Sequence, residues 1–420
     1  MKYQNRVLSL LSLLAILTYL DRVCISVAGP RMQDALHISP EQWGWVTGIF
    51  TLAYAAFEFP TGILGDRIGP RRVLTRVVLW WSAFTSLTAA ATNYSVLLAT
   101  RFCFGIGEAG AYPNVASVIA RWFPPQKRGR AWGVVWCMSQ LGGALSPILV
   151  VPIQFHYGWG ASFVTFGFLG VLWTIIWFRW FRDRPSEMPR VPPAERQEIG
   201  VRAPHADHRI KWGGALRSGN AWRLMAIGGL YCYAIAFYQS WLHTFLVKGR
   251  GFGENDLILS SLPYIVGAAA NLLGGFLTDR AARAFGLRAA RAGFGCAALS
   301  ISALSLIGAV ATASHTLVLV FLSLTYGGMT FQQSVFSAVA IDVAPRNAGA
   351  MMGMGNTAAN AGAVISQVAF GYIVSWFGNY NAPLIPMAIA LAAGAILWLG
   401  VDPAVEVFPH PKTESIIAAA

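Results

Sequence analysis

The sequence predicts an all-α membrane protein with twelve transmembrane helices arranged as two six-helix bundles. Residues of the apolar set make up 55% of the 420 residues, charged residues make up only 12%, and the mean hydropathy is +0.52. Apolar runs long enough to cross a bilayer recur along the chain, and its two halves share motifs at matching positions. A soluble surface needs roughly 25–35% charged residues. The composition therefore excludes a soluble enzyme fold and a disordered chain.

Twelve apolar runs have about the 20 residues that a helix needs to cross the hydrocarbon core. They are 8–29, 42–64, 74–92, 95–119, 130–153, 160–180, 222–246, 257–278, 292–311, 315–340, 348–374 and 382–401. A polar stretch, residues 181–221, separates the first six runs from the last six. The expected parts are an N-terminal bundle (1–180), a cytoplasmic linker with one short surface helix (181–221), a C-terminal bundle (222–401) and a cytoplasmic tail (402–420).

The basic residues favour one orientation in the membrane. The formal net charge is +13, and most Lys and Arg fall in the loops of one side, together with Lys2 and Arg6. Short cytoplasmic loops carry such an excess, so both termini are expected in the cytoplasm. The loops of the other side hold only Arg31, Lys248 and Arg250. The basic residues are therefore expected to lie at the surface of the lipid bilayer, and they do not indicate binding of a nucleic acid.

The two halves repeat each other at two places. GILGDR at Gly62–Arg67 recurs as GFLTDR at Gly275–Arg280, each after the second run of its half. A second echo has the same +4, +4 spacing in both halves: Pro125, Gly129 and Gly133, then Pro345, Gly349 and Gly353. Parallel repeats of six helices are one known design of secondary transporters.

These motifs resemble those of a known family. GILGDRIGPRR (Gly62–Arg72) is similar to the loop signature of the major facilitator superfamily. Four segments resemble its anion:cation symporter family: YLDR (Tyr19–Arg22), FEFPTGILGDR (Phe57–Arg67), RFCFGIGEAGAYPN (Arg101–Asn114) and SWLHTFLVKGRGF (Ser240–Phe252). Members of that family carry hexuronate, aldonate, tartrate, sialic acid or glutamate. The resemblance implies proton-coupled transport of a small organic anion.

Five charged residues lie inside the expected spans: Asp21, Arg22, Glu58, Arg101 and Glu108. A charge at the centre of a span costs about 2.5–3.5 kcal/mol on insertion scales and points to function. Ion pairs that only pack the helices are the alternative, and the role of Glu58 stays open. Arg101 and Glu108 are seven residues apart, so they share one helix face about 10 Å apart.

The resemblance assigns roles to these residues. It implies that Asp21 and Glu108 couple transport to protons, and that Tyr19, Arg22 and Arg101 bind substrate. The chemistry of the side chains agrees, because a guanidinium stays charged and grips a carboxylate through two donors. A carboxyl group in a poorly hydrated site can take up a proton and release it again. Tyr19 could equally be a packing residue.

Polar side chains of later spans are further candidates. The amides of Gln140, Asn356 and Asn360 suit sugar hydroxyls and are expected to bind substrate, with interhelical hydrogen bonds as the alternative. The seventh run is unusually rich in polar and aromatic residues, of which one or two should line the site: Tyr231, Tyr238, Gln239, Trp241 and His243. His243 stands where relatives often have proline, which puts the bend of that helix in doubt.

The resemblance implies that charged residues of the cytoplasmic loops form an inner gate that latches the halves in the outward-open state. They are Asp66, Arg67, Arg71, Arg72, Asp279 and Arg280. The positive-inside rule explains the same basic residues as simple anchors.

No motif of an enzyme, a metal site or a nucleotide site is present in the sequence. We therefore expect no catalytic residue, no metal and no cofactor, with the proton as coupling ion. The resulting hypothesis is a monomeric proton-coupled importer of a sugar acid in the bacterial inner membrane. An exporter or antiporter is the alternative, although SPILVV (Ser146–Val151) departs from the antiporter pattern GPxxGG. A sensor is a third, and the chain shows no signalling domain for it.

Overall fold

The computed structural model describes residues 2–199, 215, 217–344 and 348–407, and the regular elements of this part are all helical. The first half contains α1 (Tyr3–Ala35), α2 (Pro40–Ile68), α3 (Pro70–Thr88), α4 (Tyr94–Glu108), α5 (Ala111–Trp122), α6 (Pro125–Tyr157) and α7 (Trp159–Trp180). The linker contains η1 (Pro185–Glu187) and α8 (Pro193–Ile199). The second half contains α10 (Gly219–Ser240), α11 (Leu242–Thr244), η2 (Phe245–Gly249), η3 (Glu254–Ser260), α12 (Ser261–Phe285), α13 (Leu287–Ala311), α14 (His315–Asp342), α15 (Ala348–Phe377) and α16 (Leu384–Leu399).

The helices follow the expected apolar runs, and two of those runs are interrupted. The run 95–119 is divided into α4 and α5, since Pro113 has no N–H group to donate to the carbonyl group of Ala109. The run 222–246 is interrupted at Trp241, whose φ of −119° departs from helical geometry and whose indole donates to the carbonyl oxygen of Gln367 at 3.0 Å. The seventh run is therefore interrupted without a proline at this point.

Six helical segments of the described chain are long and apolar enough to cross a membrane. They are Tyr3–Ala35, Lys127–Tyr157, Trp159–Trp180, Asp256–Phe285, Leu287–Ala311 and Met351–Phe377, with α16 as a shorter apolar helix. The other expected spans are divided into shorter helices, or are more polar over their length. In α3, for example, three arginines lie within the first two turns (Arg71, Arg72 and Arg76).

The packing of the first half recurs in the second half. In the first half α1 packs on α6, α2 on α4, α3 on α4 and α3 on α7. The corresponding pairs in the second half are α10 with α15, α12 with α14, α13 with α14 and α13 with α16. Gly69 and Gly286 form equivalent turns at the ends of α2 and α12, where φ values of 89° and 86° favour glycine. The sequence echo thus reflects a structural repeat.

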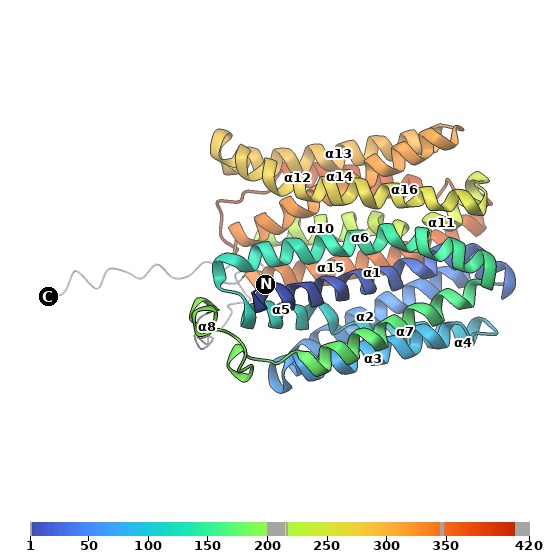
Figure 1. Ribbon diagram of the computed structural model, residues 1–420. Helices are drawn as coiled ribbons and strands as arrows, with labels where there is room; N and C mark the ends of the chain where they lie inside the picture. Colours follow the sequence, from blue (N-terminus) through green and yellow to red (C-terminus); the bar gives the residue numbers. More distant parts are fainter. Residues whose placement is uncertain (1, 200–214, 216, 345–347, 408–420) are drawn as a thin grey trace.

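We call the end of the helices that carries α8 and the N-terminus the linker side, and the opposite end the far side (Figure 1). The halves meet mainly through α2 with α15 and α6 with α12. Hydrogen bonds that join the halves in the described residues lie at the far side or near mid-depth, and they include Ser26–His243, Gln33–Thr244, Asp34–Lys248, Glu41–Ser375, Trp43–Ser240, Trp45–Tyr372, Thr51–Gln367, Gln140–Tyr326 and Glu58–Asn356. On the linker side, Gly129 and Gly133 of α6 and Gly353 of α15 face open space. The halves are therefore sealed together at the far side.

The linker helix α8 is docked against the first half. Buried Glu195 accepts a hydrogen bond from the backbone N–H group of Gln4 at 2.8 Å. Glu198 forms ion pairs with Lys2, at 2.8 Å, and with Lys127. Because Lys2 precedes α1 and Lys127 lies in the first turn of α6, one short helix ties two helices of the first half together.

Candidate functional site

The charged residues of α1 and α4 meet inside the first half. Arg22 donates through Nε to Oε1 of Glu108, whose side chain is 1% exposed. Asp21 and Arg101 are also buried, and Asp21 interacts electrostatically with Arg101 and Glu108. The sequence placed Glu108 on one face with Arg101, but the partner that Glu108 contacts directly is Arg22.

Aromatic rings surround the guanidinium group of Arg22. Its carbon lies 4.6 Å from the ring centroid of Tyr54, 5.6 Å from that of Phe50 and 5.8 Å from that of Tyr19. Such contacts stabilise a cation most strongly where water is excluded. Tyr19 therefore contacts a charged residue of the predicted site. Tyr54 and Phe50 belong to the same cluster, and their aromatic character was the only feature that could have marked them in the sequence.

Arg101 is held by rings and not by a carboxylate. Its guanidinium carbon lies 4.4 Å from the ring centroid of Phe104 and 4.9 Å from that of Phe50. Its Nε atom has no hydrogen-bond partner within the described chain, although the residue is only 2% exposed. Buried polar groups are normally hydrogen-bonded, so this donor is available to a further group.

Three more atoms of the same cluster are buried without a hydrogen-bond partner in the described part of the chain. They are Oδ1 of Asp21, Nη2 of Arg22 and Oε2 of Glu108. Two unsatisfied cation donors thus lie beside two unsatisfied carboxyl oxygens. Leaving such groups unpaired is costly, and an incoming anion and an incoming proton would satisfy both kinds.

Glu58 extends the polar cluster to the second half. Its Oε2 atom accepts a hydrogen bond from Nδ2 of Asn356 at 2.6 Å. Tyr54 and Asn360 flank the same carboxylate and interact with it, and Arg22 lies within electrostatic reach. The only signal for Glu58 in the sequence was a charge inside a span. The structure connects it to both predicted amides of α15.

Gln140 lies at another contact between the halves, where its Oε1 atom accepts a hydrogen bond from the hydroxyl group of Tyr326 at 3.1 Å. Of the candidates on the seventh run, Tyr238 donates to the carbonyl oxygen of Leu322 at 2.8 Å and Trp241 anchors to α15. His243 is fully buried in the far-side seal. Tyr231 is 9% exposed and Gln239 is half-buried.

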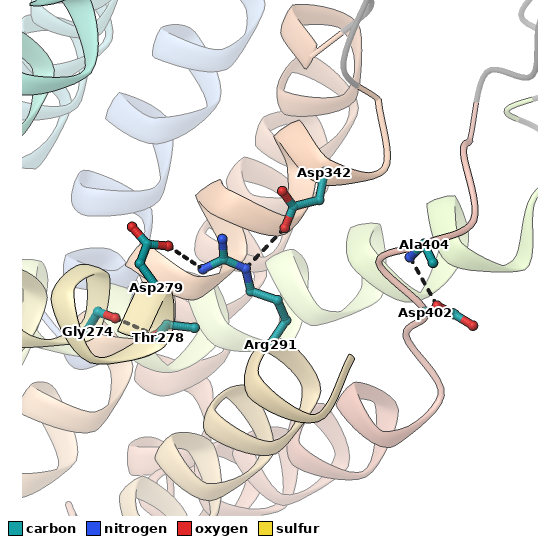
Figure 2. A network of polar contacts seen from close by, with 7 residues as sticks. All are labelled: Gly274, Thr278, Asp279, Arg291, Asp342, Asp402 and Ala404. Atoms are coloured by element: carbon teal, nitrogen blue, oxygen red, sulfur yellow. Dashed lines mark hydrogen bonds and ion pairs between the residues drawn. The ribbon is translucent and has the colours of Figure 1, made fainter. Parts of the chain in front are cut away.

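Two of the predicted gate residues, Arg71 and Asp279, make side-chain contacts within their own halves. Arg71 donates to the carbonyl oxygen of Phe178, and Arg67, Arg72 and Arg280 are exposed. The side chain of Asp66 lies outside the described residues. Figure 2 shows the counterpart in the second half, where Arg291 donates to Asp279 and to Asp342, each at 3.0 Å. This ion-pair network joins α12, α13 and α14.

Comparison with known proteins adds to this geometry. The sequence pattern of the Major Facilitator Superfamily matches residues 11–331 of this chain. The chain is 32% identical to a probable sulfoacetate transporter of Cupriavidus necator, over 96% of this chain and 94% of that protein. It is 30% identical to the hexuronate transporter of Bacillus subtilis, over 92% and 91%. A crystal structure of a bacterial homologue of the human lysosomal transporter Spinster, inward-facing and occupied, shares the fold with a TM-score of 0.77 and 20% identity, over 95% of this chain and 97% of that one.

Proposed function

This chain belongs to the major facilitator superfamily, a family of transporters and not of enzymes, and we propose that it imports a sugar acid together with protons across the bacterial inner membrane. The observation that carries the proposal is the cluster of half-buried Arg22 and buried Arg101 beside the buried carboxyl groups of Asp21 and Glu108. Arginines in a poorly hydrated site select an anion, and carboxyl groups beside them can exchange protons.

The proposed architecture is twelve spans in two six-helix bundles, which the recurring helix pairs of the two halves support. We place the linker side in the cytoplasm, because the basic loops lie there. With that orientation the far-side seal faces outward and the structure represents an inward-open state. The gate residues would then pair across the halves only in the opposite state.

The Arg22–Glu108 ion pair suggests how the two cargoes are coupled. While Glu108 is ionised, its carboxylate accepts a hydrogen bond from the Nε–H group of Arg22, so this donor is occupied. When Glu108 takes up a proton, the ion pair is lost and the guanidinium group is free to bind the carboxylate of the substrate. Proton and anion therefore favour each other's binding, which is the requirement for symport.

Three of the relatives support the class of substrate. Proteins of this family with curated names include the hexuronate transporter, a probable L-galactonate transporter of Escherichia coli and a probable galactarate/D-glucarate transporter of Bacillus subtilis, at 28–30% identity. All three names describe acids derived from sugars. We propose a hydroxylated carboxylate of that kind, with the amides of Gln140, Asn356 and Asn360 near its hydroxyl groups.

The test is uptake by purified protein in liposomes. A proton gradient, acidic outside the liposomes, should drive accumulation of a labelled aldonate or hexuronate. A protonophore should abolish this accumulation. Uptake that requires internal substrate and ignores the pH gradient would identify an exchanger. Failure to bind or carry any of these acids would overturn the proposal.

A further inference from the structure

Glu58 occupies a position where a substrate group would be expected. Its carboxylate is bound by the amide of Asn356 at 2.6 Å and flanked by Asn360 and Tyr54, with Arg22 in electrostatic reach. The two amides are residues that the proposed function assigns to the substrate. The chain thus places one of its own carboxylates on the donors that would recognise the end of the substrate remote from the arginines.

This contact joins the two halves of the protein. Glu58 belongs to α2 and Asn356 to α15, and these helices form the main contact between the halves. Asn356 is exposed and Glu58 is partly exposed, whereas Arg101 and Glu108 are buried. The Glu58 contact is therefore the open end of the polar cluster, and a substrate must compete with the carboxylate of Glu58 for the amides.

We propose that Glu58 is a specificity-determining residue that admits acids with one anionic group and rejects those with a second anionic group at the other end. This inference rests on the proposed function. A hydroxyl group at that end can donate to Glu58 and accept from the amides. A second carboxylate cannot donate and meets a like charge. Discrimination by a built-in repulsive group is a common route to specificity.

Gluconate and glucarate are the matched probes, since both are open-chain six-carbon acids that differ only in a terminal CH₂OH or carboxylate group. In wild type, gluconate should compete for uptake at least about tenfold better than glucarate, which corresponds to about 1.4 kcal/mol. In Glu58→Gln the preference should fall by about tenfold, because glutamine keeps the size and hydrogen bonding of the side chain but removes its charge.

Glu41→Gln is the control, because it removes the same charge from the same helix at the far side, where Glu41 contacts Ser39 and also Ser375 of α15 but lies away from the polar cluster. Its preference should equal that of wild type. Ligand-induced thermal shifts of the purified variants provide a readout that does not require transport. Glu58→Ala is the second variant, and it should also lose the preference.

Four results would overturn the inference: a wild-type preference for glucarate, an unchanged preference in Glu58→Gln, an equal change in Glu41→Gln, or loss of folded protein in both Glu58 variants, which would make the residue structural. These outcomes differ from failure of the proposed function. In that case wild type would carry neither acid.

Discussion

The Nδ1 atom of His243 lies 2.9 Å from the Oγ atom of Ser26, and this contact joins α11 of the second half to α1 of the first. The other ring nitrogen lies 2.7 Å from the hydroxyl group of Ser260, which itself donates to the carbonyl oxygen of Leu257 at 2.5 Å. Since the hydrogen of Ser260 is committed, Ser260 accepts from the imidazole. This network assigns the proton to Nε2 and leaves Nδ1 to accept from Ser26.

We expect His243→Phe to weaken the far-side seal. Phenylalanine keeps a ring of similar size but cannot bond to Ser26. Loss of a hydrogen bond costs about 0.5–1.5 kcal/mol, so the population of far-side-open molecules should rise about two- to tenfold. Electron-resonance distances between labels at Tyr157 and Phe377, both exposed at the far ends of their helices, measure this population. Ser26→Ala should act in the same direction, and an unchanged distance distribution in both variants would contradict the assignment.

Glu108→Gln is expected to abolish proton-driven accumulation while exchange of substrate across the membrane continues. Glutamine keeps the shape of the side chain and a hydrogen-bonding oxygen for Arg22, but it cannot cycle a proton. The measurement compares uptake under a pH gradient with exchange at equal pH on both sides. Glu187→Gln, an exposed change in the linker, is the charge-matched control. Accumulation against a gradient by Glu108→Gln would remove Glu108 from the coupling step.

Removal of Arg101 should weaken substrate binding more than it weakens the fold. Breaking the proposed charge pair between Arg101 and the carboxylate of the substrate should cost about 2–5 kcal/mol. Arg101→Ala should therefore lose tens to thousands of fold in substrate affinity. Arg101→Lys keeps the charge but loses the planar group that lies over Phe50 and Phe104, and it should recover only part of the loss. Affinity is measured on monodisperse purified protein. Unchanged affinity in both variants would make Arg101 a structural cation.

The ion pairs that dock α8 on the first half, between Glu198 and Lys2 and Lys127, should weaken only under acid conditions. Hydrogen bonds from Lys127 and Lys2 lower the pKa of Glu198 from 4.5 to about 2. A carboxyl group with a lowered pKa stabilises the folded contact above its ordinary pKa and loses that contribution as the pH falls toward the lowered value. Hydrogen exchange in α8, corrected for intrinsic rates, should therefore be constant from pH 8 to pH 5 and rise below about pH 4.5.

Glu198→Gln provides the comparison, because it should expose α8 to exchange at every pH and remove the acid-dependent rise. Protection that disappears between pH 8 and pH 6 in wild type would instead assign the contact to another titrating group.

Much of the fold could be predicted from apolar run lengths alone. The helices α7, α14, α15 and α16 begin and end within three residues of the expected runs, because the hydrocarbon thickness and the loop signals set their lengths. The interruption at Trp241 could not be predicted, since it depends on an anchor in α15, far away in the sequence.

The members of the polar cluster could be singled out from the sequence by residue type, but their pairing could not. Intramembrane charge was enough to single out Arg22, Arg101 and Glu108. Which of these residues contact each other depends on how α1 packs near α4, and the periodicity of a single helix carries no such information. Glu58 shows the same limit, because its partner Asn356 lies in the other half of the chain. Pairs that form across the halves depend on the conformational state as well as on the sequence.

The three glycines that face open space on the linker side have an energetic consequence. Gly129, Gly133 and Gly353 are exposed within helices, where glycine is less favourable than alanine by about 1 kcal/mol per residue. Alanine at positions 129 and 133 should therefore stabilise α6 itself, and it shifts the balance toward the open linker side only if the helices must approach each other there in the opposite arrangement. Residues that contact neither the substrate nor the proton can thus influence the equilibrium between the state open at the linker side and the state open at the far side. Through this equilibrium they influence the rate of transport.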